Sequence, residues 1–354
     1  MSEPPPPDRS VSGRKVEHLR AIGADPDVER RRSGFNRISL IHRALPELDY
    51  DSIDPATTFL GKSLSFPLLI SSMTGGVDDV TLRINRNIAE AAERTGVALA
   101  VGSQRVMFGA PEARRSFDLR PVAPTIPLIG NIGAVQLNCG MTHDHCAEAI
   151  DLLRADGLYL HLNPLQEAVQ PEGDRDFANL GAAIADLVPR LNVPVLLKEV
   201  GAGLSAEDID LGYRAGVRHF DVAGRGGTSW SRIEYHRRDD DDDDLGLVFQ
   251  DWGMTTVDCL EHAEAVLRRQ KDPTTLIASG GIRGGIDMAK SVILGADLCG
   301  LAAPFLEAAQ ESADRVVQRI EKLRREFITA MFLLGCPNLA ALKGNRSLIL
   351  SPPD

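Results

Sequence analysis

The sequence predicts a single (β/α)8 TIM barrel with an N-terminal extension. From Pro67 onward, short runs of β-forming apolar residues alternate with amphipathic helical segments, at spacings typical of βα units. Eight such repeats fit a chain of 354 residues, a length that one barrel can reach. The composition is 43% hydrophobic but only 5% aromatic, with 32 glycines, which favours an α/β core over a β-sandwich.

Four segments are expected along the chain. Residues 1–12 are rich in proline and polar, and we expect them to be disordered. Residues 13–66 should form an N-terminal arm and cover, residues 67–340 the barrel, and residues 341–354 a C-terminal tail. The expected strands are Leu68–Ser72, Val97–Val101, Ile126–Gly130, Leu158–His161, Val195–Lys198, His219–Val222, Leu276–Ser279 and Leu298–Gly300.

Amphipathic helices are expected between these strands. The clearest are Val80–Thr95, Asp144–Ala155 and Thr256–Gln270, and the eighth helix should run from Glu307 to about Leu334. A doubly wound open sheet is the alternative architecture. No G-x-G-x-x-G opens a first helix, so the closed barrel is preferred.

Charge and cysteine content exclude several classes of protein. The formal net charge of −11 argues against a nucleic-acid-binding surface. Five cysteines without a C-x-x-C fit a reducing compartment, and we find no signal peptide or membrane span. We therefore expect a soluble, cytoplasmic protein. The aspartate run Asp239–Asp244 should be a mobile excursion after the sixth strand, and its role stays open.

Polar side chains gather where the fourth strand ends. An apolar run from Gly157 gives way to His161, Asn163, Gln166 and Glu167. Four convergent polar side chains are hard to explain by packing, because each would need a buried partner. At the carboxyl end of a barrel strand, this arrangement indicates a site. An ordinary polar loop is the alternative.

Small residues follow the seventh and eighth strands, at Gly280-Gly281 and Ala302-Ala303. Backbone N–H groups at such helix starts bind anions, so the two loops together predict a phosphate-bearing cofactor. The fifth strand ends in Lys198, which could instead snorkel from the strand end. Arg105 after the second strand could instead form a surface ion pair.

Two other stretches have competing interpretations. The segment from Cys139 to Cys146 also holds His143 and His145, but its spacing does not suit a tetrahedral zinc site, so we predict a loop with a helix cap. The segment beginning at Arg14-Lys15 is either a solvated helix start or an arm that folds over the site and brings both cations to a phosphate.

Taken with these junctions, the chain resembles type 2 isopentenyl-diphosphate delta-isomerase, a flavin-dependent family of isoprenoid synthesis. The resemblance runs from about Arg14 to the C-terminal helix. It rests on ordered motifs: R-K-V-E-H, S-S-M-T-G-G, V-G-S-Q-R, H-L-N-P-L-Q-E, K-E-V-G, G-R-G-G-T-S-W, D-W-G and S-G-G-I-R. The proline-rich start and the aspartate run depart from the family pattern, but neither touches a motif.

The resemblance implies FMN, Mg²⁺ and a reductant such as NADPH, and interconversion of isopentenyl and dimethylallyl diphosphates. It implies that FMN contacts Ser72, Met73, Thr74, Ser103, Asn131, Lys198 and Thr228, with its phosphate on Gly280, Gly281, Arg283, Ala302 and Ala303. It assigns the substrate diphosphate to Arg14, Lys15, Ser103, Gln104, Arg105, His161 and Asn163. Gln166 would lie beside the reacting carbons, and Glu167 would bind Mg²⁺. The family also suggests a homotetramer or larger assembly.

The chemistry agrees with this reading. Moving a double bond requires adding a proton at one carbon and removing one from another, and we find no pair of site carboxylates or reactive cysteine for the task. We therefore expect reduced FMN to act as the acid–base, with Lys198 stabilising the anionic flavin. We expect the partner to be a small-molecule diphosphate substrate, and we expect no nucleic-acid or membrane partner.

Other functions remain as alternatives. An FMN-dependent 2-hydroxyacid oxidase or dehydrogenase would use a histidine base, and no histidine follows the sixth strand before His236. A nucleotide dehydrogenase related to IMP dehydrogenase would place a nucleophilic cysteine there, but the nearest is Cys259, within an expected helix. A non-enzymatic flavin-binding or scaffold role is the last alternative.

Overall fold

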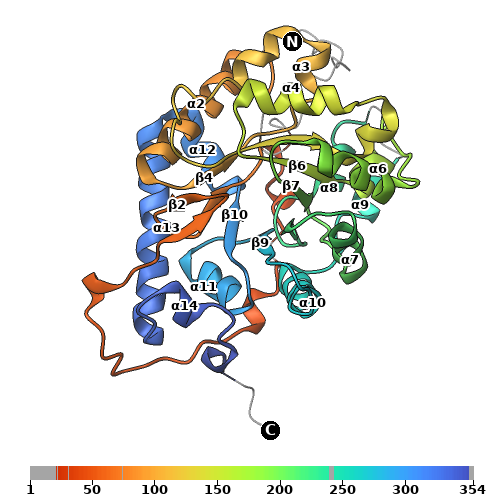
Figure 1. The fold of residues 1–354 in the computed structure, drawn as a ribbon. Coiled ribbons are helices and arrows are strands. Elements are labelled where there is room, and N and C mark those ends of the chain that lie inside the picture. The colour runs from red at the N-terminus through yellow and green to blue at the C-terminus, as the bar shows by residue number, and fades with distance from the viewer. Residues whose placement is uncertain (1–20, 22, 31, 74, 239–242, 351–354) are drawn as a thin grey trace.

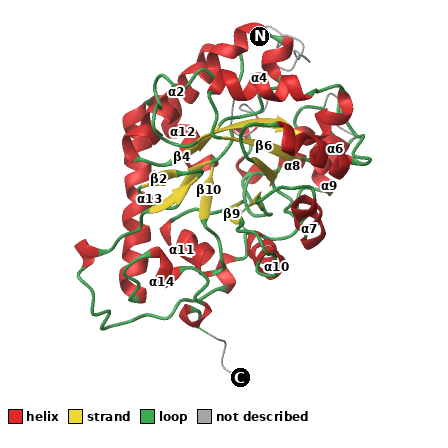
Figure 2. Ribbon diagram, in the orientation of Figure 1, coloured by secondary structure: helices red, strands yellow, loops and turns green. Residues whose placement is uncertain are grey.

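Eight parallel strands close into a barrel, as the sequence predicts (Figures 1 and 2). The computed structural model describes residues 21, 23–30, 32–73, 75–238 and 243–350. Neighbouring strands follow the chain order, and the last strand pairs with the first to close the ring. The strands are β3 (Leu68–Ile70), β4 (Ala98–Ala100), β5 (Leu128–Gly133), β6 (Gly157–Leu162), β7 (Val195–Glu199), β8 (His219–Asp221), β9 (Thr275–Ser279) and β10 (Leu298–Leu301).

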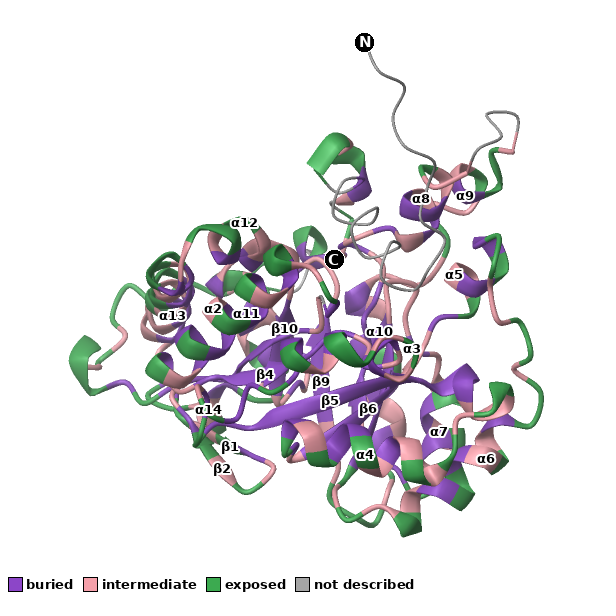
Figure 3. Ribbon diagram, turned by 90° about the horizontal axis from the view of Figure 1, so that it is seen from above, coloured by how far each residue is buried: buried purple, intermediate pink, exposed green. Residues whose placement is uncertain are grey.

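Helices surround the barrel. The α-helices with fully described bounds are α2 (Asp79–Thr95), α3 (Val106–Gly109), α4 (His143–Leu153), α5 (Pro164–Val169), α6 (Leu180–Leu187), α7 (Ala206–Arg214), α8 (Trp230–Tyr235), α9 (Leu245–Val248), α10 (Thr256–Leu267), α11 (Gly285–Ile293), α12 (Ala303–Glu311), α13 (Ala313–Leu334) and α14 (Leu339–Leu342). Both faces of the strands are buried, which explains why they read as continuous apolar runs (Figure 3). None of the described helices is long and apolar enough to cross a bilayer.

Local signals set the helix ends. In α2, the Asp78 side chain accepts from the Thr81 N–H, and Gly96 ends the helix with a φ of 67°. In α4, Thr142 and His145 form a reciprocal capping box. The predicted loop with a helix cap in the segment from Cys139 to Cys146 is confirmed.

Two sequence-based boundaries are wrong. The third barrel strand runs from Leu128 to Gly133 rather than from Ile126 to Gly130, so Asn131 lies within a strand. The expected helix from Glu307 to Leu334 is two helices, α12 and α13. Extended backbone at Ser312 separates them, and its side chain accepts from the Arg315 N–H to cap α13.

A hairpin that the sequence reading missed precedes the barrel. Strands β1 (Thr57–Phe59) and β2 (Lys62–Leu64) pair antiparallel around Leu60 and Gly61, which have φ angles of 48° and 75°. Phe59 and Leu64 join one apolar cluster with inward-facing strand residues such as Tyr159. The hairpin thus packs against the interior layer of the barrel.

Around Glu29 and Arg30, the N-terminal arm lies against the loop after β8. The Arg30 guanidinium donates to the carbonyl oxygens of Gly201, Gly227 and Gln250 over 2.8–3.2 Å. Burial lowers the pKa of Arg30 to about 10. This clamp fixes the arm near the carboxyl end of the barrel. Residues 1–20, with the proposed disordered start and the Arg14-Lys15 pair, lie outside the described residues.

Candidate active site

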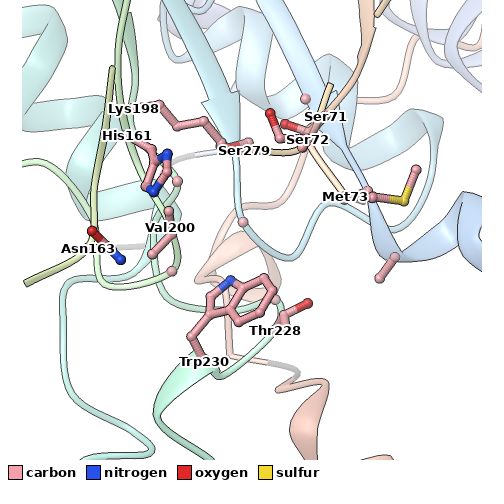
Figure 4. A pocket seen from close by; sticks show the side chains of 18 of the residues that line it. Ser71, Ser72, Met73, His161, Asn163, Lys198, Val200, Thr228, Trp230 and Ser279 are labelled. Atoms are coloured by element: carbon pink, nitrogen blue, oxygen red, sulfur yellow. Dashed lines mark hydrogen bonds between the residues drawn. The ribbon is translucent and has the colours of Figure 1, made fainter. Parts of the chain in front are cut away.

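One cavity opens at the carboxyl rim of the barrel, and residues that follow all eight strands line it (Figure 4). Sixteen of the site residues expected from the sequence line it: Ser72, Met73, Ser103, Arg105, Asn131, His161, Asn163, Gln166, Glu167, Lys198, Thr228, Gly280, Gly281, Arg283, Ala302 and Ala303. Arg14, Lys15 and Thr74 lie outside the described residues. The junctions after consecutive strands therefore converge on one place.

Gln104 is the one described member of the expected set that does not line the cavity. Its side chain is fully buried, and two hydrogen bonds satisfy the buried amide. The amide nitrogen donates to the Ala149 carbonyl at 2.8 Å, and the amide oxygen accepts from the Asn131 N–H at 3.0 Å. Gln104 thus reaches the cavity only through Asn131, whose backbone it fixes.

Asn131 links two walls of the cavity. Its amide nitrogen donates to Ser72 Oγ at 2.9 Å and to the Val101 carbonyl at 3.1 Å. Its carbonyl oxygen lies 2.7 Å from His161 Nδ1, so that ring nitrogen is the donor in this contact. The pair sets the orientation of the imidazole at the rim.

The loops after β9 and β10 form a cradle of backbone groups. Gly280 and Gly281 have φ angles of 101° and 76°, and a Cβ on Gly281 would lie 2.3 Å from the Gly226 carbonyl oxygen. Ala302 is the N-cap of α12 and lines the cavity with Ala303, so the start of this helix borders the cavity. The start of α11 does not, because the Gly285 N–H donates to Glu326 Oε2 at 2.9 Å.

Arg283 adds a side-chain cation to this cradle. Its guanidinium lies 2.6 Å from Glu29 Oε2 of the arm, and Glu29 also accepts a hydrogen bond from the Thr228 hydroxyl. Glu29 lines the cavity and was not among the residues expected from the sequence. The arm therefore contacts two residues of the expected flavin site.

Glu167 is the carboxylate of the cavity wall opposite the cradle. It accepts from Asn163 Nδ2 at 2.8 Å and from the Asp174 N–H at 2.7 Å. Burial raises the pKa of Glu167, while these two hydrogen bonds oppose the shift. Each carboxylate oxygen accepts one hydrogen bond, which leaves lone pairs for a cation or its waters.

The loop that supports Glu167 was missed in the sequence. Asp174 accepts from Arg105 Nη1 at 2.7 Å and from Gln136 Nε2 at 2.9 Å. A Cβ on Gly173 would lie 1.9 Å from the Glu167 carbonyl oxygen, so only glycine lets this loop fold over the site. The run of charged residues after Gln170 was the available signal, but nothing in it indicates which neighbours it meets.

Gln166 is also held by a buried group. Its amide nitrogen donates to Glu234 Oε1 of α8 at 2.7 Å, and its oxygen accepts from Asn163 Nδ2 at 3.1 Å. Glu234 is fully buried and pairs with Arg237. The two hydrogen bonds hold the amide nitrogen and the amide oxygen in place, so they fix the orientation of the Gln166 side chain at the cavity wall.

Two buried polar atoms at the cavity have no hydrogen-bond partner among the described residues. They are Ser71 Oγ and Asn163 Oδ1, and both residues line the cavity (Figure 4). A buried polar atom without a hydrogen-bond partner destabilises a folded protein. Such atoms in a cavity wall therefore indicate that a bound ligand or water supplies the missing hydrogen bond. A polar ligand therefore fits this cavity.

The cysteine alternative is disfavoured by position. Cys259 lies within α10, is fully buried, and burial raises its pKa to about 12. Such a thiol is not a nucleophile at neutral pH. His236, the first histidine after the sixth barrel strand, caps the end of α8 and lies 2.6 Å from Asp25 rather than at the cavity wall.

Comparisons with known proteins place this site in a class. The family model of FMN-dependent dehydrogenases matches residues 163–349. The flavin-binding domain of baker's yeast flavocytochrome b2 superposes with a TM-score of 0.70 at 19% identity, covering 99% of this chain and 91% of that one. A mandelate oxidase superposes with a TM-score of 0.61 at 17% identity, over 94% and 91% of the two chains. These structures show a shared fold, and the chain is a barrel of the FMN-dependent dehydrogenase class.

Curated relatives narrow the class further. The isopentenyl-diphosphate delta-isomerase of Paracoccus zeaxanthinifaciens is 67% identical over 342 residues, covering 97% of this chain and 98% of the relative. The enzyme of the same name from Hydrogenovibrio crunogenus is 54% identical, over 97% and 99% of the two chains. The chain belongs to the isopentenyl-diphosphate delta-isomerase family.

Proposed function

We propose that the protein is an FMN-dependent isomerase that interconverts isopentenyl diphosphate and dimethylallyl diphosphate in isoprenoid biosynthesis. The observation that carries this proposal is the cavity at the carboxyl rim, which residues after all eight barrel strands line. It joins an anion cradle after β9 and β10 to the polar segment from His161 to Glu167. Family membership supplies the identity of the substrate.

The flavin would lie between the two sets of residues labelled in Figure 4. Ser72, Met73 and the unpartnered Ser71 hydroxyl come from one wall, and Lys198 comes from the other. Ser103, Asn131 and Thr228 complete the polar contacts, and Thr74 is proposed as a further contact outside the described residues. When bound in its reduced form, FMN supplies the acid–base group that the chain itself lacks.

The phosphate of FMN would occupy the cradle. Gly280 and Gly281 expose backbone N–H groups, Ala302 and Ala303 open α12, and Arg283 brings a cation. A phosphate there would share Arg283 with Glu29.

The substrate diphosphate would bind on the opposite wall. Arg105, His161, Asn163 and Ser103 face the cavity there, and Arg14 and Lys15 are proposed to join them from the part of the arm that is not described. Gln104 would act on this wall only through Asn131. Separate cations suit an anion that carries several charges.

Glu167 would hold Mg²⁺ against the diphosphate. One carboxylate suffices, because Mg²⁺ prefers phosphate oxygens and retained waters to an all-protein cage. The unpartnered Asn163 oxygen lies beside this carboxylate and can accept from a water of the ion. Gln166 would lie next to the carbons that gain and lose a proton, and Lys198 would stabilise the negative charge of reduced flavin.

The remaining parts of the proposal come from the family resemblance. NADPH or a similar reductant would keep the flavin reduced, while the isomerisation itself consumes no electrons. The protein would act in the cytoplasm, as a homotetramer or larger assembly. Size-exclusion chromatography with light scattering tests the assembly, and anaerobic flavin reduction by NADPH tests the reductant.

Activity of two variants tests the site assignment. We expect Gln166→Asn and Glu167→Gln to lose isomerase activity at least tenfold, with FMN occupancy kept, when assayed anaerobically with isopentenyl diphosphate and Mg²⁺. The exposed Gln318→Asn and Glu307→Gln are matched controls and should keep full activity. Full activity in both site variants would contradict the assignment, and oxygen-linked turnover of a hydroxyacid by the native protein would favour the oxidase alternative.

A further inference from the structure

A fully buried carboxylate, Asp221, lies at the end of β8 behind the cavity wall. It does not line the cavity itself. It accepts hydrogen bonds from three other strands: from the Tyr159 hydroxyl at 2.9 Å, from Lys198 Nζ at 3.0 Å, and from the Ser279 hydroxyl. None of these contacts could be read from the sequence, where Asp221 interrupts an apolar run.

The three donors differ in charge. Burial raises the pKa of Tyr159 well above its usual value of 10, so its hydroxyl stays a neutral donor. Ser279 is neutral as well. Lys198 is therefore the group that balances the charge of Asp221, and an isolated buried carboxylate would cost several kcal/mol without such a partner.

Lys198 depends on Asp221 in turn. The two residues are register partners on neighbouring strands, and the lysine lines the cavity with its side chain almost fully buried. Among the described residues, its two hydrogen bonds go to Asp221 and, at 3.3 Å, to Ser279. Asp221 is the charged anchor of a flexible four-carbon stem that has no other ionic contact among those residues.

We propose that Asp221 is a positioning residue of the flavin site, which fixes the ammonium of Lys198 at the cavity wall where it stabilises reduced FMN. This inference rests on the proposed function, because it takes Lys198 to face the flavin. It goes beyond that function in assigning the support of Lys198 to one buried carboxylate on the next strand.

The alternative is that the pair only stabilises the barrel. Removing one partner of a buried ion pair destabilises a protein in either case, by leaving the other charge unpaired. A loss of stability or of activity in an Asp221 variant would therefore not distinguish a positioning role in the flavin site from a purely structural role. The preference of the protein for reduced over oxidised FMN does separate them, because a purely structural pair would not change it.

The test measures the dissociation constants of oxidised and reduced FMN for the native protein, Asp221→Asn, Lys198→Gln and the double variant. We expect Lys198→Gln to lower the preference for reduced FMN, and Asp221→Asn to shift it in the same direction by tenfold or more. A tenfold change corresponds to about 30 mV in the midpoint potential of a two-electron couple. The double variant should match Lys198→Gln alone.

Asp156→Asn is the matched control. Asp156 is a partly buried carboxylate just before β6, at the amino end of the barrel, where it pairs with Lys62 at 2.8 Å. It should lose stability without a change in FMN preference. If Asp221→Asn does not fold, Tyr159→Phe loosens the same carboxylate without altering its charge, and we expect a smaller shift in the same direction.

An unchanged FMN preference in the variant tested, or a shift opposite to that of Lys198→Gln, would overturn the inference. An unchanged preference in Lys198→Gln would overturn it too, because Asp221 would then have no cation to act through. Failure of the proposed function gives a different result: the native holoenzyme would bind FMN and yet not convert isopentenyl diphosphate.

Discussion

Gly173 shows how one missing side chain shapes the loop beside Glu167, the proposed Mg²⁺ ligand. Its φ lies outside the left-handed region, so backbone conformation does not require glycine there. The close approach of the loop does, since a Cβ would meet the Glu167 carbonyl oxygen at 1.9 Å and its carbonyl carbon at 2.7 Å. The same loop brings the Asp174 N–H to the Glu167 carboxylate.

We predict that Gly173→Ala lowers isomerase activity at least tenfold while FMN binding is kept, because the loop must move away from Glu167. Activity at several Mg²⁺ concentrations, with FMN absorbance as the occupancy readout, measures this. Gly109→Ala is the control, since a Cβ there meets nothing within 4 Å. Equal activity in the two variants would show that the loop tolerates the displacement.

Cavity residues at strand ends were predictable, whereas Glu29 of the arm and the residues that support the cavity wall were not. His161 to Glu167 stand together at a strand end, which is where a barrel places its chemistry. Asp174, Glu234 and Asp221 act through partners that are distant in the chain or on another strand. No local spacing records such contacts, so sequence reasoning had no signal for them.

The arm is fastened to α8 by Asp25. The Asp25 carboxylate lies 2.5 Å from Arg232 Nε and 2.6 Å from His236 Nε2. The hydrogen bond from Arg232 is the main cause that lowers its pKa from 3.8 to about 2, with burial opposing and His236 helping. The ionised form is therefore favoured by folding.

We predict that Asp25→Asn destabilises the protein by roughly 1 kcal/mol at pH 7. Because the folded pKa lies below the unfolded one, the Asp25 contribution is complete above about pH 4 and is lost as the pH falls toward about 2. Urea unfolding from pH 7 downward measures the difference between native and variant protein. Asp27→Asn, whose side chain is 82% exposed, should show no such difference. A difference in the free energy of unfolding between native protein and Asp25→Asn that persists unchanged to pH 2 would contradict this account.

The break between α12 and α13 depends on Ser312. We predict that Ser312→Ala lowers the free energy of unfolding by about 1 kcal/mol, since the first turn of α13 loses its side-chain acceptor. Chemical denaturation followed by circular dichroism measures the change. Ser312→Asp should restore the cap and the stability of the native protein. If Ser312→Ala is as stable as the native protein, packing alone sets the break between α12 and α13.

Elements that contain an apolar run were predictable, and elements without one were not. All eight barrel strands were predicted because buried parallel strands form apolar runs between helices. The hairpin strands β1 and β2, T-T-F and K-S-L, contain one apolar residue each, so no apolar run marks them. The helix break at Ser312 was missed because the apolar periodicity continues across it, although serine followed by a new helical turn is a capping signal.

At the scale of the molecule, the barrel and its cofactor should form one cooperative unit. The proposed flavin contacts belong to seven of the eight barrel strands and the loops that follow them, all except β6, so bound FMN would tie together segments far apart in the chain. We predict that FMN at 100 times its dissociation constant stabilises the protein by about 2.7 kcal/mol. Thermal unfolding with FMN and with riboflavin, which lacks the phosphate, measures this, and the larger shift should belong to FMN. Equal shifts would mean that the cradle after β9 and β10 does not hold the phosphate.

We propose that one cavity at the carboxyl rim holds FMN beside a magnesium-bound diphosphate. A crystal structure of the holoenzyme soaked with Mg²⁺ and isopentenyl diphosphate tests it most directly. We predict the FMN phosphate on the Gly280–Arg283 and Ala302–Ala303 loops and the diphosphate within reach of Arg105, His161 and Glu167. Either ligand bound at the amino end of the barrel or on its outer surface would contradict the account.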